Sequence, residues 1–292
     1  MPQLALKVIR PLVRASSTVS PRFTGRLAFR LFCTPMRHAP VNRQSAGIRR
    51  AEAVFEKGKA ALVTHGWGFV KVVRFEPEGE SRGTVLVLHG WTGQGIFMAG
   101  FVEPLLARGF SVIVMDMPAH GGSSGRLLNF PIGVEAISAV VRGVQPLAGI
   151  IAHSFGGAVA AAAVGGAIDA FPAIRAKALV SIAAPATMQV YGKKFTDTLG
   201  LTPRGHQAFE DRVLEIAGRP MASFSGREFI ARSATKTLVI HAADDREIPL
   251  ADAEDLAAAP GASLMRVDGL GHRRILVSRE VQEAAAEFIA AV

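Results

Sequence analysis

Short apolar runs alternate with amphipathic stretches from about residue 60 to the end of the chain. Aliphatic runs bounded by Gly, Pro or Asp predict strands that are buried on both faces of a sheet. We expect an opening hairpin that turns at 65–68, followed by buried strands at 84–89, 111–116, 148–153, 177–185, 236–242 and 263–269. Helical spacing of apolar residues predicts helices at about 97–108, 131–145, 155–169, 250–259 and 277–291. This alternation predicts an α/β fold with a mostly parallel, doubly wound sheet.

One connection is much longer than the others. About fifty residues separate the strand that ends near 185 from the strand that begins near 236, whereas ordinary connections in such folds are far shorter. This segment carries helical spacing, so we predict a helical cap inserted at about 186–233. Ligands bind at the carboxyl edge of open α/β sheets. We therefore expect the apolar side chains of the cap to line a pocket there, among them Phe195, Leu199, Leu201, Phe209, Val213, Leu214, Ile216, Phe224 and Phe229.

Length and composition predict one large domain. The chain has 292 residues, of which 49% are hydrophobic, enough for a sizeable core. The single cysteine, Cys33, excludes an internal disulfide and any paired-cysteine metal or redox motif. The glycine-rich stretches lack the lysine and spacing of a phosphate-binding loop. We expect no metal and no cofactor.

The positive charge lies at the N-terminus. The net charge is +9, but residues 1–51 contain ten Lys or Arg and no acidic residue, and the remainder carries 23 basic against 24 acidic residues. No basic patch is left to indicate nucleic acid. We predict a basic helical extension over 1–55 that packs on the main domain at 56–292, because Pro11, Pro21, Pro35 and Pro40 divide it into short helices.

Two other interpretations of the extension stay open. Basic amphipathic segments also lie on membrane surfaces, so residues 1–35 are a candidate for peripheral membrane contact, and arginine-rich segments without acids also occur in organelle presequences. The sequence contains neither the apolar core of a secretory signal nor a run near the roughly 18 apolar residues of a membrane span. We expect a cytoplasmic location, with or without membrane contact.

Three serines compete as candidate nucleophiles. Ser81 in GESRG and Ser123 in GGSSG match the G-x-S-x-G pattern, whereas Ser154 in AHSFG has Ala152 in place of the first glycine. A nucleophile elbow requires a strand directly before the serine and a helix directly after it. Only Ser154 has this context. Alanine adds a single methyl group, and Gly156 and Gly157 keep the helix side of the turn small.

Later stretches supply partners for Ser154. A serine hydroxyl needs a histidine to take its proton and an acid to orient that histidine, in the chain order serine, acid, histidine. HAADDREIP offers Asp244 and Asp245 after a strand, and DGLGHRRIL places His272 in a glycine-flanked loop. Three separate stretches in this order favour hydrolytic chemistry.

From about Gly83 onward the sequence resembles the α/β-hydrolase superfamily, through VLVLHGWTGQG, DMPAHGGSSG, AHSFGG, HAADDREIP and GLGHRRIL, and RLAFRLFCTP resembles an N-terminal extension of small bacterial members. The resemblance implies that Ser154 attacks a carbonyl carbon and that His272 is general base and then general acid. It also selects Asp245 as the acid, four residues after His241. Backbone N–H groups of Trp91 and Phe155 would form the oxyanion hole. His89 and Asp116 are expected to brace their own loops.

We predict a serine hydrolase that cleaves a small carboxylic ester with a fairly apolar acyl group. A thioesterase, lactonase, carbon–carbon bond hydrolase or acyltransferase would use the same triad, and a non-catalytic member that binds a ligand or partner stays open because fold alone does not fix function. The sequence indicates neither the alcohol group nor the oligomeric state.

Overall fold

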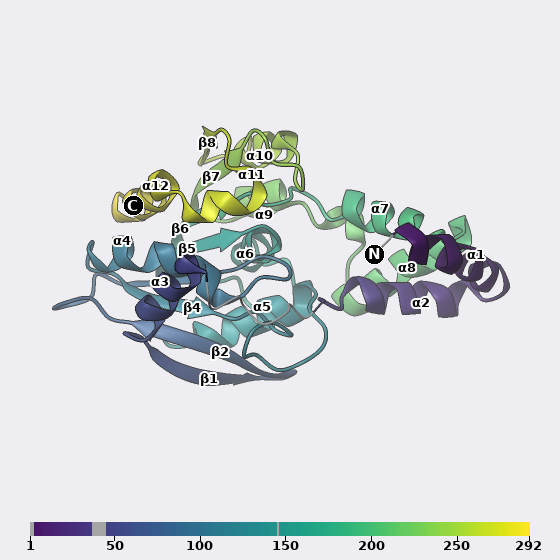
Figure 1. The fold of residues 1–292 in the computed structure, drawn as a ribbon, viewed down its shortest axis with the longest axis horizontal. Helices are drawn as coiled ribbons and strands as arrows, with labels where there is room; N and C mark the ends of the chain where they lie inside the picture. The colour runs from purple at the N-terminus through teal and green to yellow at the C-terminus, as the bar shows by residue number, and fades with distance from the viewer. Residues whose placement is uncertain (1–2, 37–44, 145) are drawn as a thin grey trace. The chain divides into compact units, whose positions relative to one another are not determined.

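The computed structural model describes residues 3–36, 45–144 and 146–292 (Figure 1). Contacts within the chain form two units. One consists of Met1–Thr34 and Thr187–Ser225, and the other of Pro35–Ala186 and Gly226–Val292. We call them the helical unit and the α/β unit. The domain limits expected from the sequence, 1–55 and 56–292, stay a prediction; the described contacts group the first two helices with the insertion.

An eight-stranded sheet forms the centre of the α/β unit, with strand order β1-β2-β4-β3-β5-β6-β7-β8. The first two strands form the expected hairpin, β2 runs antiparallel to β4, and all later neighbours are parallel. The strands are β1 (Lys59–His65), β2 (Gly68–Phe75), β3 (Thr84–Leu88), β4 (Ser111–Met115), β5 (Leu147–His153), β6 (Ala176–Ile182), β7 (Lys236–Ala242) and β8 (Ala262–Val267). The predicted doubly wound α/β fold is confirmed.

Helices cover both faces of this sheet. The helices and 3₁₀ segments of the α/β unit are α3 (Ala46–Phe55), η1 (Gly95–Phe101), α4 (Val102–Leu106), α5 (Phe130–Val140), α6 (Phe155–Val164), α9 (Gly226–Arg232), α10 (Leu250–Ala257), α11 (Gly271–Arg274), η3 (Ile275–Val277) and α12 (Arg279–Ala290). Buried residues of η1, α4 and α12 join Val180 and Ile182 of β6 in one core. Ser181, between those two residues, points the other way and lies close to Gly157 of α6. Because side chains alternate along a strand, α6 covers the opposite face.

Strand composition explains why these segments form the centre. Every residue of β3, β4 and β5 is buried, and continuous aliphatic runs are typical of parallel strands covered on both faces. β1 is mostly exposed, as expected for an edge strand. The carboxyl ends of β5 and β7 lie at the same edge of the sheet, because both strands run parallel to β6, which lies between them. This edge places the candidate nucleophile near the acid turn.

The helical unit is held together by α2 and α8. Its helices are α1 (Gln3–Val19), α2 (Pro21–Phe32), α7 (Gln189–Leu199) and α8 (Pro203–Ala217), with the 3₁₀ turn η2 (Met221–Ser223). Gly25 allows a close crossing, since a Cβ there would lie 2.7 Å from the backbone of Ala208. The ring of Phe32 lies 5.1 Å from that of Phe195 and 5.6 Å from that of Phe209. Phe195 and Phe209 of the insertion therefore pack against α2.

Candidate active site

Ser154 occupies a sharp turn between β5 and α6. Its backbone has φ 52° and ψ −127°, a conformation that residues other than glycine rarely adopt. The Ser154 N–H donates to the carbonyl of Ile182 at 2.8 Å, which ties the turn to the neighbouring strand β6. A strained serine between a strand and a helix is the geometry of a nucleophile elbow.

Small residues let this turn form. A Cβ on Gly156 would lie 2.4 Å from the carbonyl oxygen of His89, and one on Gly157 would lie 2.7 Å from the Cβ of Ala184. Both positions therefore require glycine. Ala152 is fully buried in β5 and pairs with Leu88 and Ser181, so its methyl group is accommodated. The departure from the strict pattern leaves the elbow intact.

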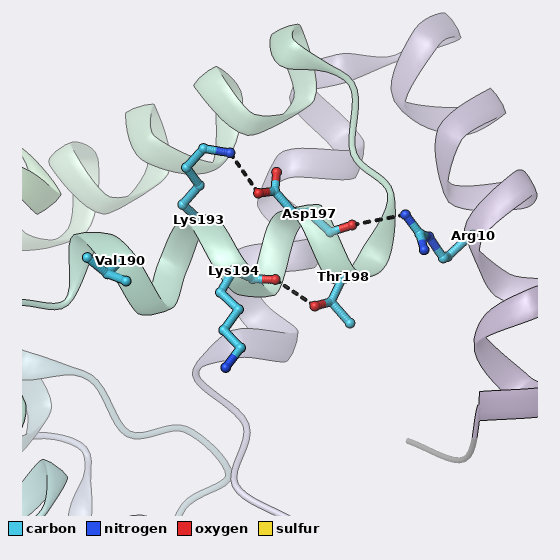
Figure 2. Close-up of a pocket in the computed structure, with 6 residues that line it drawn as sticks. All are labelled: Arg10, Val190, Lys193, Lys194, Asp197 and Thr198. Atoms are coloured by element: carbon cyan, nitrogen blue, oxygen red, sulfur yellow. Dashed lines mark hydrogen bonds and ion pairs between the residues drawn. The ribbon is translucent and has the colours of Figure 1, made fainter. Parts of the chain in front are cut away.

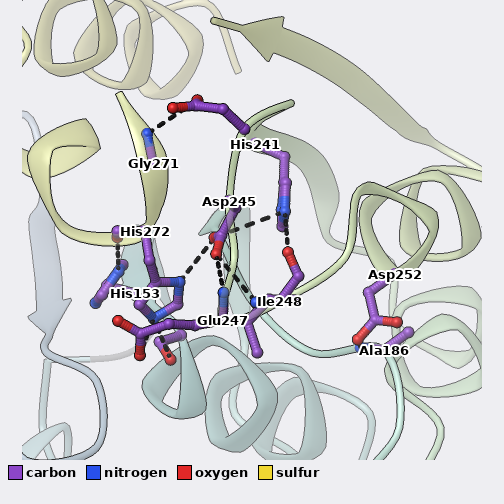
Figure 3. A network of polar contacts seen from close by, with 11 residues as sticks. His153, Ala186, His241, Asp245, Glu247, Ile248, Asp252, Gly271 and His272 are labelled. Atoms are coloured by element: carbon purple, nitrogen blue, oxygen red, sulfur yellow. Dashed lines mark hydrogen bonds and ion pairs between the residues drawn. The ribbon is translucent and has the colours of Figure 1, made fainter. Parts of the chain in front are cut away.

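His272 contacts Asp245 (Figure 3) with one ring nitrogen and Ser154 with the other. Its Nε2 lies 3.1 Å from the Ser154 Oγ, and its Nδ1 lies 2.8 Å from the Asp245 Oδ2. An ionised carboxylate only accepts hydrogen bonds, so Nδ1–H donates to Asp245 and Nε2 is left to accept from the serine hydroxyl. His272 is nearly buried, with 8% of its side chain exposed, and the Asp245 side chain is buried. The arrangement can take a proton from Ser154.

Asp245 is held in its ionised state. Burial opposes ionisation, but the hydrogen bonds from His272, Ile248 and Glu247 lower the pKa of this carboxyl below its ordinary value. The backbone N–H groups of Glu247 and Ile248 donate to its Oδ1 at 2.8 and 3.0 Å, which leaves Oδ2 for His272. Asp244 has a separate task, because its Oδ1 accepts from the Gly271 N–H at 3.0 Å. The tandem acids thus hold the histidine side chain and the histidine loop.

A second histidine supports the first. The His153 Nε2–H donates to the carbonyl of His272 at 2.9 Å, and the two rings lie 4.8 Å apart. Burial, followed by the nearby His272 ring, lowers the pKa of His153 to about 3. His153 is therefore neutral at ordinary pH and fixes the backbone of His272 without adding charge.

The loop after β3 lies against the elbow. A Cβ on Gly90 would lie 2.7 Å from the Ser154 Cβ, and the rings of Trp91 and Phe155 lie 5.4 Å apart. His89 braces this loop, as expected, by accepting from the Met117 N–H at 2.9 Å and donating to the Gly90 carbonyl at 2.7 Å. Both residues expected to supply oxyanion donors thus flank Ser154.

Asp116 holds the two loops that follow β3 and β4. Its Oδ1 accepts from the Gly95 N–H at 2.6 Å, and its Oδ2 accepts from the Gly122 N–H at 2.9 Å. This is the bracing that the sequence predicts for Asp116. The carboxylate lies outside the chain of hydrogen bonds that joins Ser154, His272 and Asp245, so its role is to shape the loops.

The two serines with the strict pattern lie in turns. The Ser81 hydroxyl donates to the Gly83 carbonyl at 3.0 Å. The Ser123 hydroxyl donates to the Asp116 carbonyl at 2.7 Å and accepts from the Lys71 N–H at 2.8 Å. Both hydroxyls serve local backbone, and neither follows a strand directly. Structural context therefore distinguishes Ser154 from both.

A cavity of about 1240 Å³ opens at Ser154 and His272. Its walls come from α3, from η1 and α4, and from η3 and the start of α12, and the apolar lining includes Ile48, Val54, Phe97, Pro104, Leu276 and Val277. All of these lining residues belong to the α/β unit. The expected lining of the acyl pocket by apolar residues of the insertion stays a prediction.

In the described part of the chain, no group of three or more His, Cys, Asp or Glu side chains is placed to hold a metal ion. Among the same residues, no helix combines the length and the apolar character needed to cross a bilayer.

Comparison with known proteins agrees with this geometry. The profile of the Alpha/beta hydrolase family matches residues 85–291. The chain belongs to the alpha/beta hydrolase family. Solved structures with a similar fold include an esterase from Pyrococcus furiosus, at 18% identity and a TM-score of 0.62 over 89% of this chain and 97% of that one. An esterase domain from Rhodothermus marinus has 20% identity and a TM-score of 0.54 over 80% of this chain and 96% of that one.

A curated relative carries a different activity in its name. The dihydrolipoyllysine-residue acetyltransferase component of the acetoin cleaving system of Cupriavidus necator is 28% identical to this chain over an alignment of 236 positions, and the match covers 68% of this chain. The chain spans 61% of the length of that relative.

The sequence analysis missed a charged pair at the site, Glu247 and Arg273. Glu247 places its Oε2 3.9 Å from the His272 Nε2, and its Oε1 pairs with the Arg273 Nε at 3.3 Å. Both residues line the cavity. The available signal was their place in the sequence, since Glu247 comes two residues after Asp245 and Arg273 directly follows His272, and residues on the same tight turns lie near the same opening. A charged pair thus stands beside the general base that we propose.

Proposed function

We propose that this member of the alpha/beta hydrolase family is a serine esterase. The observation that carries the proposal is the hydrogen-bonded series Ser154, His272 and Asp245, with the serine in a strained elbow at the mouth of a cavity. Ser154 would attack the ester carbonyl and pass its proton to His272, which then protonates the leaving alcohol. Water would release the acyl group with His272 as base. Asp245 would hold the imidazole in the tautomer that this requires.

The oxyanion would be held by backbone N–H groups of Trp91 and Phe155. Phe155 is the first residue of α6, and the first N–H groups of a helix have no partner within the helix. Trp91 follows Gly90 in the loop that lies against Ser154. Main-chain donors need no polar side chain, so two aromatic residues can serve here. The loss of one such donor costs about a hundredfold to a thousandfold in rate.

The cavity lining supports an apolar acyl group of moderate length. Apolar residues from α3, η1 and η3 line the space beside Ser154, and apolar surface favours the burial of an alkyl chain by about 0.8 kcal/mol per methylene. We expect kcat/KM to rise along a series of nitrophenyl esters as the acyl chain lengthens. A maximum with the acetyl ester would contradict this assignment of the acyl group while leaving the triad in place.

Labelling with a fluorophosphonate probe tests the nucleophile. The probe reacts with an activated serine, so we expect peptide mapping to find the label on Ser154 and its loss in Ser154→Ala and His272→Ala. Ser81→Ala is the matched control, because its serine has the strict motif but bonds local backbone. A folded wild-type protein that stays unlabelled would favour a non-catalytic binding member of the family. Label on Ser81 would refute the choice of serine.

Acyl transfer is the second candidate function, favoured by the name of the Cupriavidus relative. The acceptor would then be a thiol instead of water. With an acyl ester as donor and dihydrolipoamide added, a transferase forms the thioester faster than the free acid. If thiol leaves the rate of acid release unchanged and no thioester appears, the acceptor is water. The same assay with thioester and lactone substrates separates the remaining hydrolases.

We also propose peripheral membrane contact through residues 1–35, independent of the triad. The support is the basic, amphipathic character of α1 and α2. The cytoplasmic location expected from the sequence stays a prediction.

A further inference from the structure

The helical unit carries most of the excess charge of the chain. Its two segments contain 11 Lys or Arg and four Asp or Glu, a net charge of +7 out of +9 for the whole protein. All the acids lie in Thr187–Ser225, and the first 34 residues contain six basic residues and no acid. A surface of this charge attracts anionic partners.

Helix α2 divides into three sectors around its axis. Thr24, Gly25 and Ala28 are buried against α8 and α7. Phe23, Leu27 and Leu31, four residues apart, form a row with exposures of 64%, 55% and 42%. The basic sector consists of Arg22, Arg26 and Arg30, and at 100° per residue it lies between the buried sector and the exposed apolar row. We call Phe23, Leu27 and Leu31 the apolar stripe.

Helix α1 repeats this arrangement. Its side toward the unit includes the buried Ser17, which bonds the Thr202 hydroxyl at 2.8 Å. Val8, Leu12 and Val19 lie on another side with exposures of 66%, 67% and 86%. The basic residues Lys7, Arg10 and Arg14 follow one edge of α1, again at helical spacing. Two helices thus expose large apolar side chains although each already buries another face.

A shallow hollow between α1 and α7 adds to the positive surface (Figure 2). It has a volume of about 530 Å³ and is lined by Arg10, Lys193 and Lys194, with exposed Val190 beside them. One acid offsets these cations: Lys193 pairs with Asp197 at 2.7 Å, and Arg10 bonds only the Asp197 carbonyl among the contacts drawn. The hollow therefore keeps a positive balance next to apolar surface.

We propose that the apolar stripe of α2 and its flanking arginines dock the helical unit on an anionic phospholipid surface. The stripe would enter the boundary between headgroups and acyl chains while Arg22 and Arg30 contact phosphates, the arrangement of interfacial amphipathic helices. This rests on the membrane contact proposed above for residues 1–35 and does not depend on the esterase assignment. A second copy of this chain fits the surface poorly, because two units of net charge +7 repel each other.

Vesicle co-sedimentation tests the proposal with the full chain. We expect binding to phosphatidylglycerol-containing vesicles, little binding to pure phosphatidylcholine, and release at high salt. The triple variant Phe23→Ser, Leu27→Ser, Leu31→Ser should lower the partition coefficient about tenfold or more. Arg22→Gln and Arg30→Gln should each lower it about fivefold.

Matched variants separate the stripe from general hydrophobicity. Leu62→Ser removes an apolar side chain of similar exposure, 61%, on edge strand β1 of the α/β unit, and it should bind vesicles as the wild type does. Ser154→Ala should also bind normally, so loss of esterase activity and loss of docking are distinguishable. Sedimentation velocity reports whether the stripe instead pairs two chains.

If the triple variant fails to fold, Phe23→Trp with brominated lipid replaces it. We expect bromine on the upper acyl chain to quench the fluorescence of the new tryptophan. The wild type, which keeps Phe23, gives the signal of Trp67 and Trp91 that is subtracted. Three results would overturn the proposal: no binding by the wild type, unchanged binding by the folded triple variant, or a stripe-dependent dimer without vesicle binding.

Discussion

The buried His153 gives the hydrolase a defined acid sensitivity. Its pKa is lowered from 6.5 to about 3 in the folded protein, first by burial and then by the His272 ring. The unfolded chain binds a proton on this imidazole below about pH 6.5, whereas the folded protein does not until about pH 3. The unfolded state therefore binds more protons between these values. The contribution of His153 to stability is fully present above pH 6.5 and is lost as the pH falls toward 3.

The size of the effect follows from the shift. Between pH 7 and pH 5, the difference in proton binding should cost the folded state about 2 kcal/mol, at roughly 1.4 kcal/mol per pH unit below the unfolded pKa. His153→Gln keeps a side-chain donor for the His272 carbonyl but does not titrate. We expect urea unfolding to show that the free energy of unfolding falls about 2 kcal/mol less in this variant than in the wild type over the same interval.

Ser154→Ala is the control for this measurement, because it changes the site but retains His153. It should lose stability with falling pH as the wild type does. Equal pH dependence of the wild type and His153→Gln, with both folded at pH 7, would refute the reasoning. It would mean that His153 is protonated in the folded protein or that the site opens to solvent.

Further changes test the triad and the elbow. Asp245→Asn should lower kcat about 10⁴-fold, because the amide favours the wrong imidazole tautomer, and should change the unfolding midpoint little. Steady-state ester hydrolysis checks the loss of kcat, and urea unfolding checks the midpoint. A loss of kcat under tenfold would contradict the role of Asp245 in orienting His272. Gly156→Ala should destabilise the fold by about 1–3 kcal/mol, because its Cβ would lie 2.4 Å from the His89 carbonyl; Gly47→Ala, with open space in α3, should be neutral or stabilising in the same thermal melts. Asp244→Ala should lower kcat more than it raises KM, because the Gly271 N–H loses its acceptor. Asp244→Asn, which keeps an acceptor oxygen, should restore kcat. Unchanged kinetics in Asp244→Ala would show that the histidine loop keeps its position without this hydrogen bond.

The sequence was most informative where burial leaves few choices. Continuous aliphatic runs predicted each central strand, because a strand covered on both faces has no room for polar side chains. The order of Ser154, the pair Asp244 and Asp245, and His272 after β5, β7 and β8 predicted which turns meet, since parallel strands bring their carboxyl ends to one edge. The family resemblance then selected Asp245. The structure adds the distances and the contacts of Asp244 with the histidine loop.

Other features depend on partners that patterning does not specify. The apolar spacing of 186–233 correctly indicated helices, but an amphipathic helix does not show which surface covers it, and the sequence did not indicate that Phe209 packs against α2. Helix α3 forms a cavity wall, which the sequence did not indicate. His153 and Glu247 lie near His272 only because the fold brings the elbow and the acid turn beside the histidine loop.

The make-up of the helical unit affects how the chain folds during synthesis. Helices α1 and α2 leave the ribosome long before their packing partner α8, which ends at Ala217. At about 5–20 residues per second, roughly 10–40 s pass before that partner has been made. Throughout this interval Phe29 and Phe32 have no aromatic rings of α7 and α8 to contact. The apolar faces of nascent α1 and α2 therefore stay uncovered for this interval, and slower translation between residues 34 and 217 should lower the yield of folded protein.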